Sequence, residues 1–189
     1  KSVAQVRLVA GKGNITVNNL SYSYNGINKV IDNVSFEIKS GEKVLIYGDS
    51  GSGKSTIMKL LVKYLQGYQG EIRLDGYNLQ SLDLYDIRTK ICYVSQKENL
   101  FTDSIYNNIV LDRDISYETF MDIAKFTYVE ELVGSKNLNY HYLLEENGFN
   151  LSGGERQKII LARTLLQEAD IYIFDEALNA IDIKRERII

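Results

Sequence analysis

The chain has 189 residues, of which 44% are hydrophobic, and a formal net charge of −3. This length allows one domain with a sizeable core, and the slightly acidic balance excludes the overall positive field that attracts nucleic acid or anionic membranes. The single cysteine, Cys92, excludes an internal disulfide, and no apolar run reaches the roughly 18–20 residues of a membrane span.

The first part of the chain is predicted to be rich in strands. Residues 15–24 alternate in part between apolar and polar side chains, and residues 34–38 alternate cleanly, as half-buried strands do. Residues 44–47 form a short continuous apolar run, which is typical of a strand buried on both faces. A glycine-rich loop comes next, and residues 55–65 are predicted to form a helix. This order of strand, loop and helix is the context that a phosphate-binding loop requires.

The glycine-rich loop at residues 48–56 carries the complete pattern G-x-x-x-x-G-K-[ST]. Its glycines allow the backbone to turn N–H groups inward around the β- and γ-phosphates of a nucleoside triphosphate. We expect Lys54 to reach these phosphates, Ser55 to place its hydroxyl on Mg²⁺, and Thr56 to contact the α-phosphate. The nucleotide-binding residues predicted in this loop are Gly48, Asp49, Ser50, Gly51, Ser52, Gly53, Lys54, Ser55 and Thr56.

Strand and helix patterns continue to alternate after this loop. Residues 71–74 are predicted to form a strand, residues 83–90 a short helix, and residues 91–94 a buried strand. The pattern is then mostly helical up to about residue 168, and Ser116 is a predicted N-cap. The organisation is therefore a β-rich first part, a phosphate-loop core, and a helical subdomain at about residues 99–167.

A pair of acidic residues follows the helical part. Residues 171–174 form an apolar run, Ile-Tyr-Ile-Phe, that ends in Asp175 and Glu176. Asp175 is therefore predicted at the carboxyl end of a core strand, which is where open α/β sheets bind their ligands. We expect Asp175 to hold Mg²⁺ through water, and Glu176 to polarise the attacking water as a general base.

The sequence LSGGE at residues 151–155 is the feature that best distinguishes this chain from other proteins with a phosphate loop. A serine hydroxyl and two glycine amides at the start of a helix form an anion site, made here by Ser152, Gly153 and Gly154. The phosphate loop is already complete without these residues. This second anion site therefore needs a second phosphate.

The phosphate loop, the LSGGE sequence and the Asp-Glu pair, in this order and spacing, resemble the nucleotide-binding domain of an ATP-binding cassette (ABC) transporter. The resemblance covers nearly the whole chain, from about residue 15 to residue 182. It implies an α/β fold: a P-loop NTPase core with mostly parallel strands, an antiparallel β subdomain and a helical subdomain. It also implies an ATPase with ATP and Mg²⁺ as cofactors.

The resemblance assigns two further residues to the nucleotide. Gln96 follows a predicted strand, and in ABC domains this glutamine touches Mg²⁺ and the attacking water, so that Gln96 joins Glu176 and Lys54 as a catalytic residue. Tyr24 resembles the aromatic residue that stacks on adenine. Tyr22 is the alternative, because it lies two residues away on the same face of a strand.

In the family, the LSGGE segment binds the γ-phosphate held by a second copy, and two copies pack head to tail with two composite sites. The implied partner is therefore a second nucleotide-binding domain, either identical or similar. Residues 179–182 resemble the loop that crosses this interface. The family more often has Gln at the position of Glu155, which we expect to be harmless, and Ser at the position of Asn179, which puts the coupling across the interface in question.

Three stretches resemble exporters rather than importers: residues 84–88, residues 100–105 with residues 108–109, and residues 146–148. The last of these resembles the exporter segment that contacts the membrane domain. The resemblance thus implies a motor domain that powers export, with bacterial peptide or bacteriocin exporters as the nearest likeness. The second implied partner is a transmembrane domain in the same full-length chain. The domain would then lie at the cytoplasmic face of the cell membrane.

Other functions are alternatives from different classes. An importer ATPase would bind a separately encoded permease. A DNA-repair or chromosome-structure ATPase would need a long coiled coil, and the interval from Gln96 to Ser152 is too short and lacks sustained heptads. A non-catalytic nucleotide-sensing module is the third alternative.

The two ends of the chain depart from the family. Residues 1–13 are expected to be the end of a linker, and the nucleotide-binding domain to occupy residues 14–189. Family members carry a further strand and a switch histidine after the interface loop, and we expect this C-terminal part to be absent. The one histidine, His141, precedes the LSGGE segment and is interpreted as a surface or packing residue. The 189 residues alone are therefore expected to bind MgATP but to hydrolyse it poorly.

Overall fold

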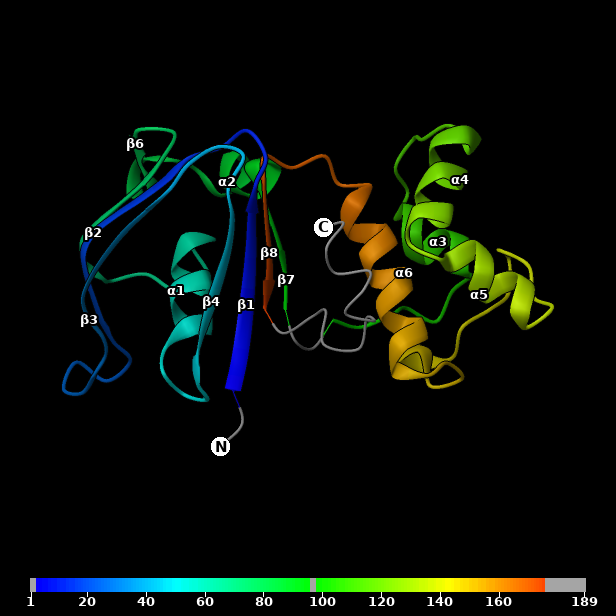
Figure 1. The fold of residues 1–189 in the computed structure, drawn as a ribbon, viewed down its shortest axis with the longest axis horizontal. Coiled ribbons are helices and arrows are strands. Elements are labelled where there is room, and N and C mark those ends of the chain that lie inside the picture. Colours follow the sequence, from blue (N-terminus) through cyan, green and yellow to red (C-terminus); the bar gives the residue numbers. More distant parts are fainter. Residues whose placement is uncertain (1–2, 96–97, 176–189) are drawn as a thin grey trace. The chain divides into compact units, whose positions relative to one another are not determined.

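The computed structural model describes residues 3–95 and 98–175 (Figure 1). These residues form two compact units. Within the described part, the first unit contains residues 3–95 together with 169–175, and the second contains residues 98–168. None of the helices in these ranges is long and apolar enough to cross a membrane.

The first sheet of the first unit has the strand order β4-β1-β8-β7 (Figure 1). β8 (Ile171–Asp175) and β7 (Ile91–Val94) are parallel. β1 (Val3–Ala10) lies antiparallel between β8 and β4 (Lys43–Asp49). The strands β4, β8 and β7 therefore run in the same direction. As a result, the phosphate loop after β4 lies at the same edge of the sheet as the end of β8.

β1 is an inner strand with one buried face. The alternate side chains of Val6, Leu8 and Ala10 are 0% exposed, as a period of two requires when one face of a strand meets the core. The sequence predicts the end of a linker at residues 1–13, whereas residues 3–10 pair with two strands. The alternation of side chains is visible in the sequence. The pairing of β1 with β4 and β8 is not visible there, because these two strands lie far along the chain.

The second sheet of the first unit is antiparallel, with the order β3-β2-β5-β6. It comprises β3 (Lys29–Ile38), β2 (Ile15–Ser23), β5 (Gln69–Leu74) and β6 (Tyr77–Asn78). The register of β2 shifts after Val17, so that this strand bends before it reaches its end. The two sheets and the helices of this unit share one apolar core.

Three helical elements complete the first unit: α1 (Lys54–Leu61), the short η1 (Leu79–Ser81) and α2 (Leu84–Lys90). α1 contacts β3, β4 and β8. Its residues Met58 and Leu60 are 0% exposed. This burial fixes the helix, and with it the loop that precedes it, against the strand that ends in Asp175.

The second unit is helical. It contains α3 (Ile105–Val110), α4 (Tyr117–Phe126), α5 (Val129–Ser135), the short η2 (Glu146–Gly148) and α6 (Gly153–Leu165). α6 contacts α3, α4 and α5, which lie together on one side of it (Figure 1). Its core is a cluster of buried apolar side chains, among them Leu100, Ile105, Ile109, Phe120, Leu132, Leu144, Leu151 and Ile159.

Serine caps begin three helices of this unit. The side chains of Ser104, Ser116 and Ser152 accept a backbone N–H from the first turn of α3, α4 and α6. Such a bond satisfies one of the amides that a helix start leaves without a partner. The N-cap predicted at Ser116 is confirmed.

Candidate functional site

The glycine-rich loop lies between the end of β4 and the start of α1. Gly51 and Gly53 have φ angles of +83° and +92°, which side chains rarely adopt. A Cβ atom at Gly53 would also lie 2.9 Å from the backbone oxygen of Val30. Gly53 occupies the N-cap position of α1 and supplies no side-chain hydrogen bond. The first amides of α1 are thus left for an anionic ligand.

Lys54 folds back into this loop. It is 7% exposed, and its Nζ donates to the backbone oxygens of Gly48 (3.0 Å) and Asp49 (2.8 Å) and to Ser52 Oγ (3.0 Å). All three acceptors are neutral, so they satisfy the ammonium hydrogens without cancelling the charge. A phosphate brought into the loop would meet a positive charge that is already in position.

Ser55 and Asp175 join the start of α1 to the end of β8. The Ser55 hydroxyl donates to Asp175 Oδ1 at 3.0 Å, although the two residues are far apart in the sequence. Asp175 is 4% exposed. Tyr93, on β7, donates its hydroxyl to the second oxygen, Oδ2, also at 3.0 Å. Sequence reasoning did not identify Tyr93, because the signal is a contact between two strands.

The residues around Asp175 fit a magnesium ion. Mg²⁺ prefers oxygen ligands, keeps several of its waters, and takes one or two carboxylates from a protein. Ser55 and Asp175 supply a hydroxyl and a carboxylate within hydrogen-bond distance of each other. Both lie next to the loop that carries Lys54, so a cation held by them would also reach the oxygens of a bound phosphate.

Tyr24 and Tyr22 differ sharply in exposure. Tyr24 is 58% exposed, whereas Tyr22 is 9% exposed, and their rings meet edge to face with centroids 5.1 Å apart. The Tyr24 hydroxyl lies 3.0 Å from the hydroxyl of Thr56 on α1. The exposed ring beside the phosphate-loop helix is therefore Tyr24, which supports it over Tyr22 as a stacking surface for a base.

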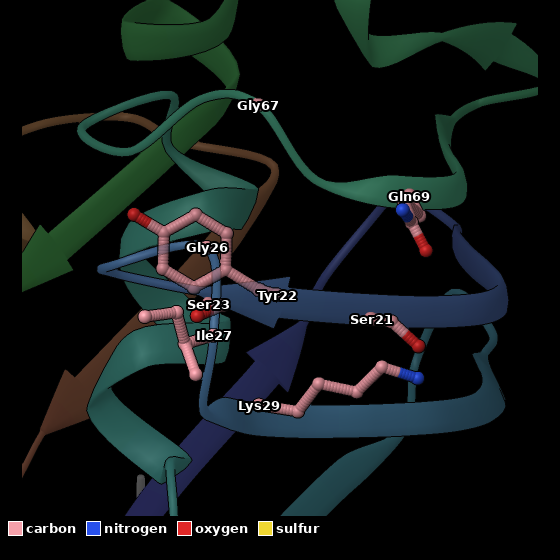
Figure 2. A pocket seen from close by; sticks show the side chains of 8 residues that line it. All are labelled: Ser21, Tyr22, Ser23, Gly26, Ile27, Lys29, Gly67 and Gln69. Carbon is pink, nitrogen blue, oxygen red and sulfur yellow. The ribbon is translucent and has the colours of Figure 1, made fainter.

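A shallow pocket lies beside Tyr22 (Figure 2). The β2–β3 hairpin forms one side of it and the segment before β5 forms the other. Gly26 and Gly67 have positive φ angles and nothing near the position of a Cβ atom, which keeps the pocket open. Its lining residues are Ser21, Tyr22, Ser23, Gly26, Ile27, Lys29, Gly67 and Gln69.

The LSGGE segment belongs to the second unit, where it begins α6. The backbone N–H of Ser152 donates to Glu155 Oε2 at 2.7 Å, and the N–H of Glu155 donates to Ser152 Oγ at 3.3 Å. This reciprocal pair is a capping box. Ser152 and Gly153 are exposed. The turn before α6 is therefore rigid and open to solvent.

Glu155 is ionised at neutral pH in this arrangement. Burial alone raises its pKa, but hydrogen bonds from the Ser152 backbone and from Lys136 outweigh burial and hold the pKa below the usual range. Lys136 Nζ lies 3.1 Å from Glu155 Oε2. The carboxylate is thus bound on both sides within the second unit.

The predicted site residues fall into three groups. The phosphate loop, Tyr24 and Asp175 lie in the first unit, and Ser152, Gly153 and Gly154 lie in the second. The remaining predictions, Gln96, Glu176 and residues 179–182, lie outside the described residues.

A buried lysine in a glycine-rich loop, a helix that begins at this loop, and a serine–aspartate pair beside it define a nucleotide-binding domain of the P-loop class. The sequence profile of the family described as "ABC transporter" matches residues 31–179. The chain therefore belongs to the ABC transporter family, in which it corresponds to the ATPase domain.

Individual relatives agree with this family. The chain is 39% identical over 195 residues to the ATP-dependent lipid A-core flippase of Francisella tularensis subsp. holarctica (strain OSU18), a match that covers 100% of this chain and 31% of the flippase. It is 38% identical over 179 residues to heavy metal tolerance factor 1 of Caenorhabditis elegans, covering 94% of this chain and 22% of that protein. It thus spans less than a third of each relative.

A solved structure agrees in fold. A bacterial Atm1-family ABC exporter with ATP bound matches with a TM-score of 0.83 and 30% sequence identity, and the match covers 95% of this chain and 32% of that one. This match confirms the fold class predicted from the sequence, an ABC-type α/β domain.

Proposed function

We propose that this chain is the ATP-binding and ATP-hydrolysing motor domain of an ABC exporter, and that it powers export from the cytoplasmic face of a membrane. The observation that carries the proposal is the buried Lys54, whose three acceptors are neutral. A buried cation without a compensating charge among these acceptors favours a strongly anionic ligand. ATP is such a ligand.

Each part of the nucleotide has a matching part of the first unit. The amides of residues 48–56 and Lys54 would bind the β- and γ-phosphates, and Tyr24 would stack on the adenine. Ser55, Asp175 and Gln96 would hold Mg²⁺, which supplies charge neutralisation at the γ-phosphate when it is bound. Glu176 would polarise the attacking water.

The exposed start of α6 supports head-to-tail pairing. The amides of Gly153 and Gly154 and the Ser152 hydroxyl make an anion site, and the capping box holds it in one conformation. Because the phosphate loop is complete in itself, the anion for this second site would be the γ-phosphate on another cassette. ATP would then close a dimer, and hydrolysis with product release would reopen it.

The second unit also offers a surface for a membrane domain. Phe101, Leu143 and Phe149 are 57%, 67% and 72% exposed. Leu143 forms a β-bridge with Ser104, which brings the two segments together. Exposed apolar groups of this kind mark interaction sites. The surface lies beside η2 (Glu146–Gly148), the exporter-like segment, which supports a transmembrane domain as its partner.

Arg163 ties this surface to the LSGGE helix. From α6, its guanidinium donates to Asn108 O (2.7 Å), Asn108 Oδ1 (2.9 Å) and Asn99 O (2.9 Å), and it lies over the Phe101 ring. Asn108 is 0% exposed and also bonds both backbone groups of Phe101. A partner that moves Phe101 would therefore move α6 with it.

The exported substrate is a separate question. The relatives are named for lipid A-core in one case and for heavy metal tolerance in the other. A peptide substrate therefore stays a prediction of the sequence. The two names differ, although both proteins match this chain over the same domain, so substrate choice would lie in parts of those proteins outside the match.

The proposal is tested by the size of the full-length protein carrying Glu176→Gln, in detergent or nanodiscs, and of the isolated domain with the same change. We expect the isolated domain to shift from monomer to dimer only when MgATP is added, since a slowed catalytic step preserves the closed state. Sedimentation velocity gives the size directly.

Two control variants separate the steps of this test. Lys54→Ala should abolish nucleotide binding and dimerisation together. Ser152→Arg should leave nucleotide binding intact and prevent dimerisation, because a long side chain then occupies the second anion site. Binding of ATP by a Glu176→Gln domain that stays monomeric at every concentration, in both preparations, would contradict the pairing.

A further inference from the structure

Tyr93 contacts the carboxylate of Asp175 through the oxygen that Ser55 does not bind. It lies on β7, where it is paired with Ile173 of the parallel strand β8. Asp175 is two residues further along β8, about 6.6 Å away along the strand, and on the same face as Ile173. A tyrosine side chain is long enough to cover this distance, and its hydroxyl donates to Asp175 Oδ2 at 3.0 Å.

The Tyr93 ring is held in place by its neighbours. It packs against the apolar core of the first unit and meets the Tyr64 ring edge to face, with centroids 5.8 Å apart and an interplanar angle of 87°. Such contacts restrict the ring to one orientation. This packing therefore holds the Tyr93 hydroxyl in one position beside Asp175.

The two oxygens of Asp175 have different partners. Oδ1 accepts from Ser55, at the start of α1, and Oδ2 accepts from Tyr93. With Oδ2 held by Tyr93, the plane of the carboxylate is fixed and Oδ1 faces the phosphate loop. A single partner would leave the carboxylate able to rotate about its last bond, which is a soft torsion.

We propose that Tyr93 is a positioning residue for the divalent cation that accompanies the nucleotide, and that it acts by orienting Asp175. The inference rests on the proposed function, because it needs a cation at Ser55 and Asp175. Groups that orient a metal-binding carboxylate typically contribute about 10- to 100-fold to metal affinity. The hydroxyl of Tyr93 would supply this orientation through its bond to Asp175 Oδ2.

The test is the affinity of the full-length protein for Mn²⁺ in the presence of a non-hydrolysable ATP analogue, measured by electron paramagnetic resonance of free Mn²⁺. The same analogue is titrated without any divalent cation. Tyr93→Phe removes one oxygen atom and keeps the ring. We expect it to weaken Mn²⁺ binding about tenfold, while the affinity for the analogue without cation stays the same.

Tyr64→Phe is the matched control. It removes a hydroxyl from the other ring of the same pair. Tyr64 touches the Tyr93 ring, and its hydroxyl is not one of the two that bind Asp175. We expect wild-type affinities from this variant. Thermal unfolding of both variants without ligand shows whether either change disturbs the fold.

Three results would overturn the inference. Unchanged Mn²⁺ affinity in Tyr93→Phe would mean that Asp175 needs no orientation from Tyr93. An equal loss of analogue binding with and without cation would mean that Tyr93 supports the site only structurally. A wild-type protein that binds no nucleotide would instead refute the proposed function itself, and the inference with it.

Discussion

The hydroxyl of Ser55 lies 3.0 Å from Oδ1 of Asp175 and connects the first turn of α1 to the last residue of β8. This contact joins the two parts of the chain that would share a cation. It also gives the buried carboxylate, which is 4% exposed, one of the two hydrogen bonds that it accepts from described residues. A fold is destabilised when a buried carboxylate loses a hydrogen-bond partner.

Ser55→Ala should therefore have two effects. Without ligand, the free energy of unfolding should fall by about 1–2 kcal/mol, because Asp175 loses the bond from Ser55 and, among the described residues, retains the bond from Tyr93. With ligand, the added affinity for nucleotide that Mg²⁺ provides should largely disappear. Urea unfolding and nucleotide titrations with and without Mg²⁺ measure the two effects separately. A variant whose nucleotide affinity still rises on addition of Mg²⁺ as in the wild type would exclude Ser55 as a cation ligand.

Tyr22 on β2 and Tyr24, which follows the end of that strand, should respond oppositely to truncation. Tyr24→Ala removes an exposed ring, so nucleotide affinity should fall by about tenfold, in line with about 1–3 kcal/mol per stacked base, while stability changes little. Tyr22→Ala removes a buried ring and should lower the free energy of unfolding by about 3 kcal/mol or more. Fluorescent-nucleotide titration and urea unfolding of both variants check this. Equal nucleotide affinity in Tyr24→Ala and the wild type would show that Tyr24 does not stack on the base.

Much of the fold follows from local sequence patterns. The strands at residues 91–94 and 171–175, the helix at residues 84–90 and the cap at Ser116 all lie where the periodicity predicts them. One predicted helix is shorter than expected: α1 ends at Leu61 rather than near residue 65, because Lys63 adopts a φ angle of +55°. A left-handed residue ends a helix, and no side-chain pattern marks Lys63 for it.

What the sequence does not predict is pairing between distant segments. The central position of β1 depends on β4 and β8, and the role of Tyr93 depends on which strand lies beside β7. Tyr22 and Tyr24 also look equivalent in the sequence, since both lie on one face of a strand. They differ in burial because Tyr22 packs into the apolar core of the first unit, whereas Tyr24 contacts Thr56 of α1 at the surface of that unit.

Gly53 should tolerate no side chain. Gly53→Ala would place its Cβ atom 2.9 Å from the Val30 backbone oxygen at a φ angle of +92°, so both a collision and backbone strain are expected. Gly76 has a φ angle of +82° with nothing within 4 Å, so Gly76→Ala isolates the strain alone, about 1 kcal/mol. Gly53→Ala should cost clearly more and should weaken nucleotide binding, whereas Gly76→Ala should leave binding unchanged. Urea unfolding and nucleotide titration of the pair decide whether the collision matters.

Glu155 should make the stability of the second unit depend on pH. Its pKa is held below the usual value in the folded state, so ionised Glu155 stabilises the fold above its unfolded pKa of about 4.3. This contribution is lost as the pH falls through the lower, folded pKa. Glu155→Gln keeps an oxygen that can accept the Ser152 N–H but loses the charge that faces Lys136. Because the Glu155 side chain is partly exposed to solvent, which screens the ion pair, its replacement should lower the free energy of unfolding at pH 7 by at most about 1 kcal/mol.

The difference between wild type and Glu155→Gln should shrink as the pH falls below about 4, because protonated glutamic acid is then also neutral. Urea unfolding followed by circular dichroism at pH 7 and at pH 3 measures it. Lys136→Met is the matching control, since it removes the ion pair from the other side but keeps the Ser152 backbone bond, and it should lose only the part of the pH dependence that Lys136 supplies. A difference that is constant across this pH range would show that Glu155 acts on the α6 cap through its shape alone, and that its charge has no part in holding the LSGGE segment.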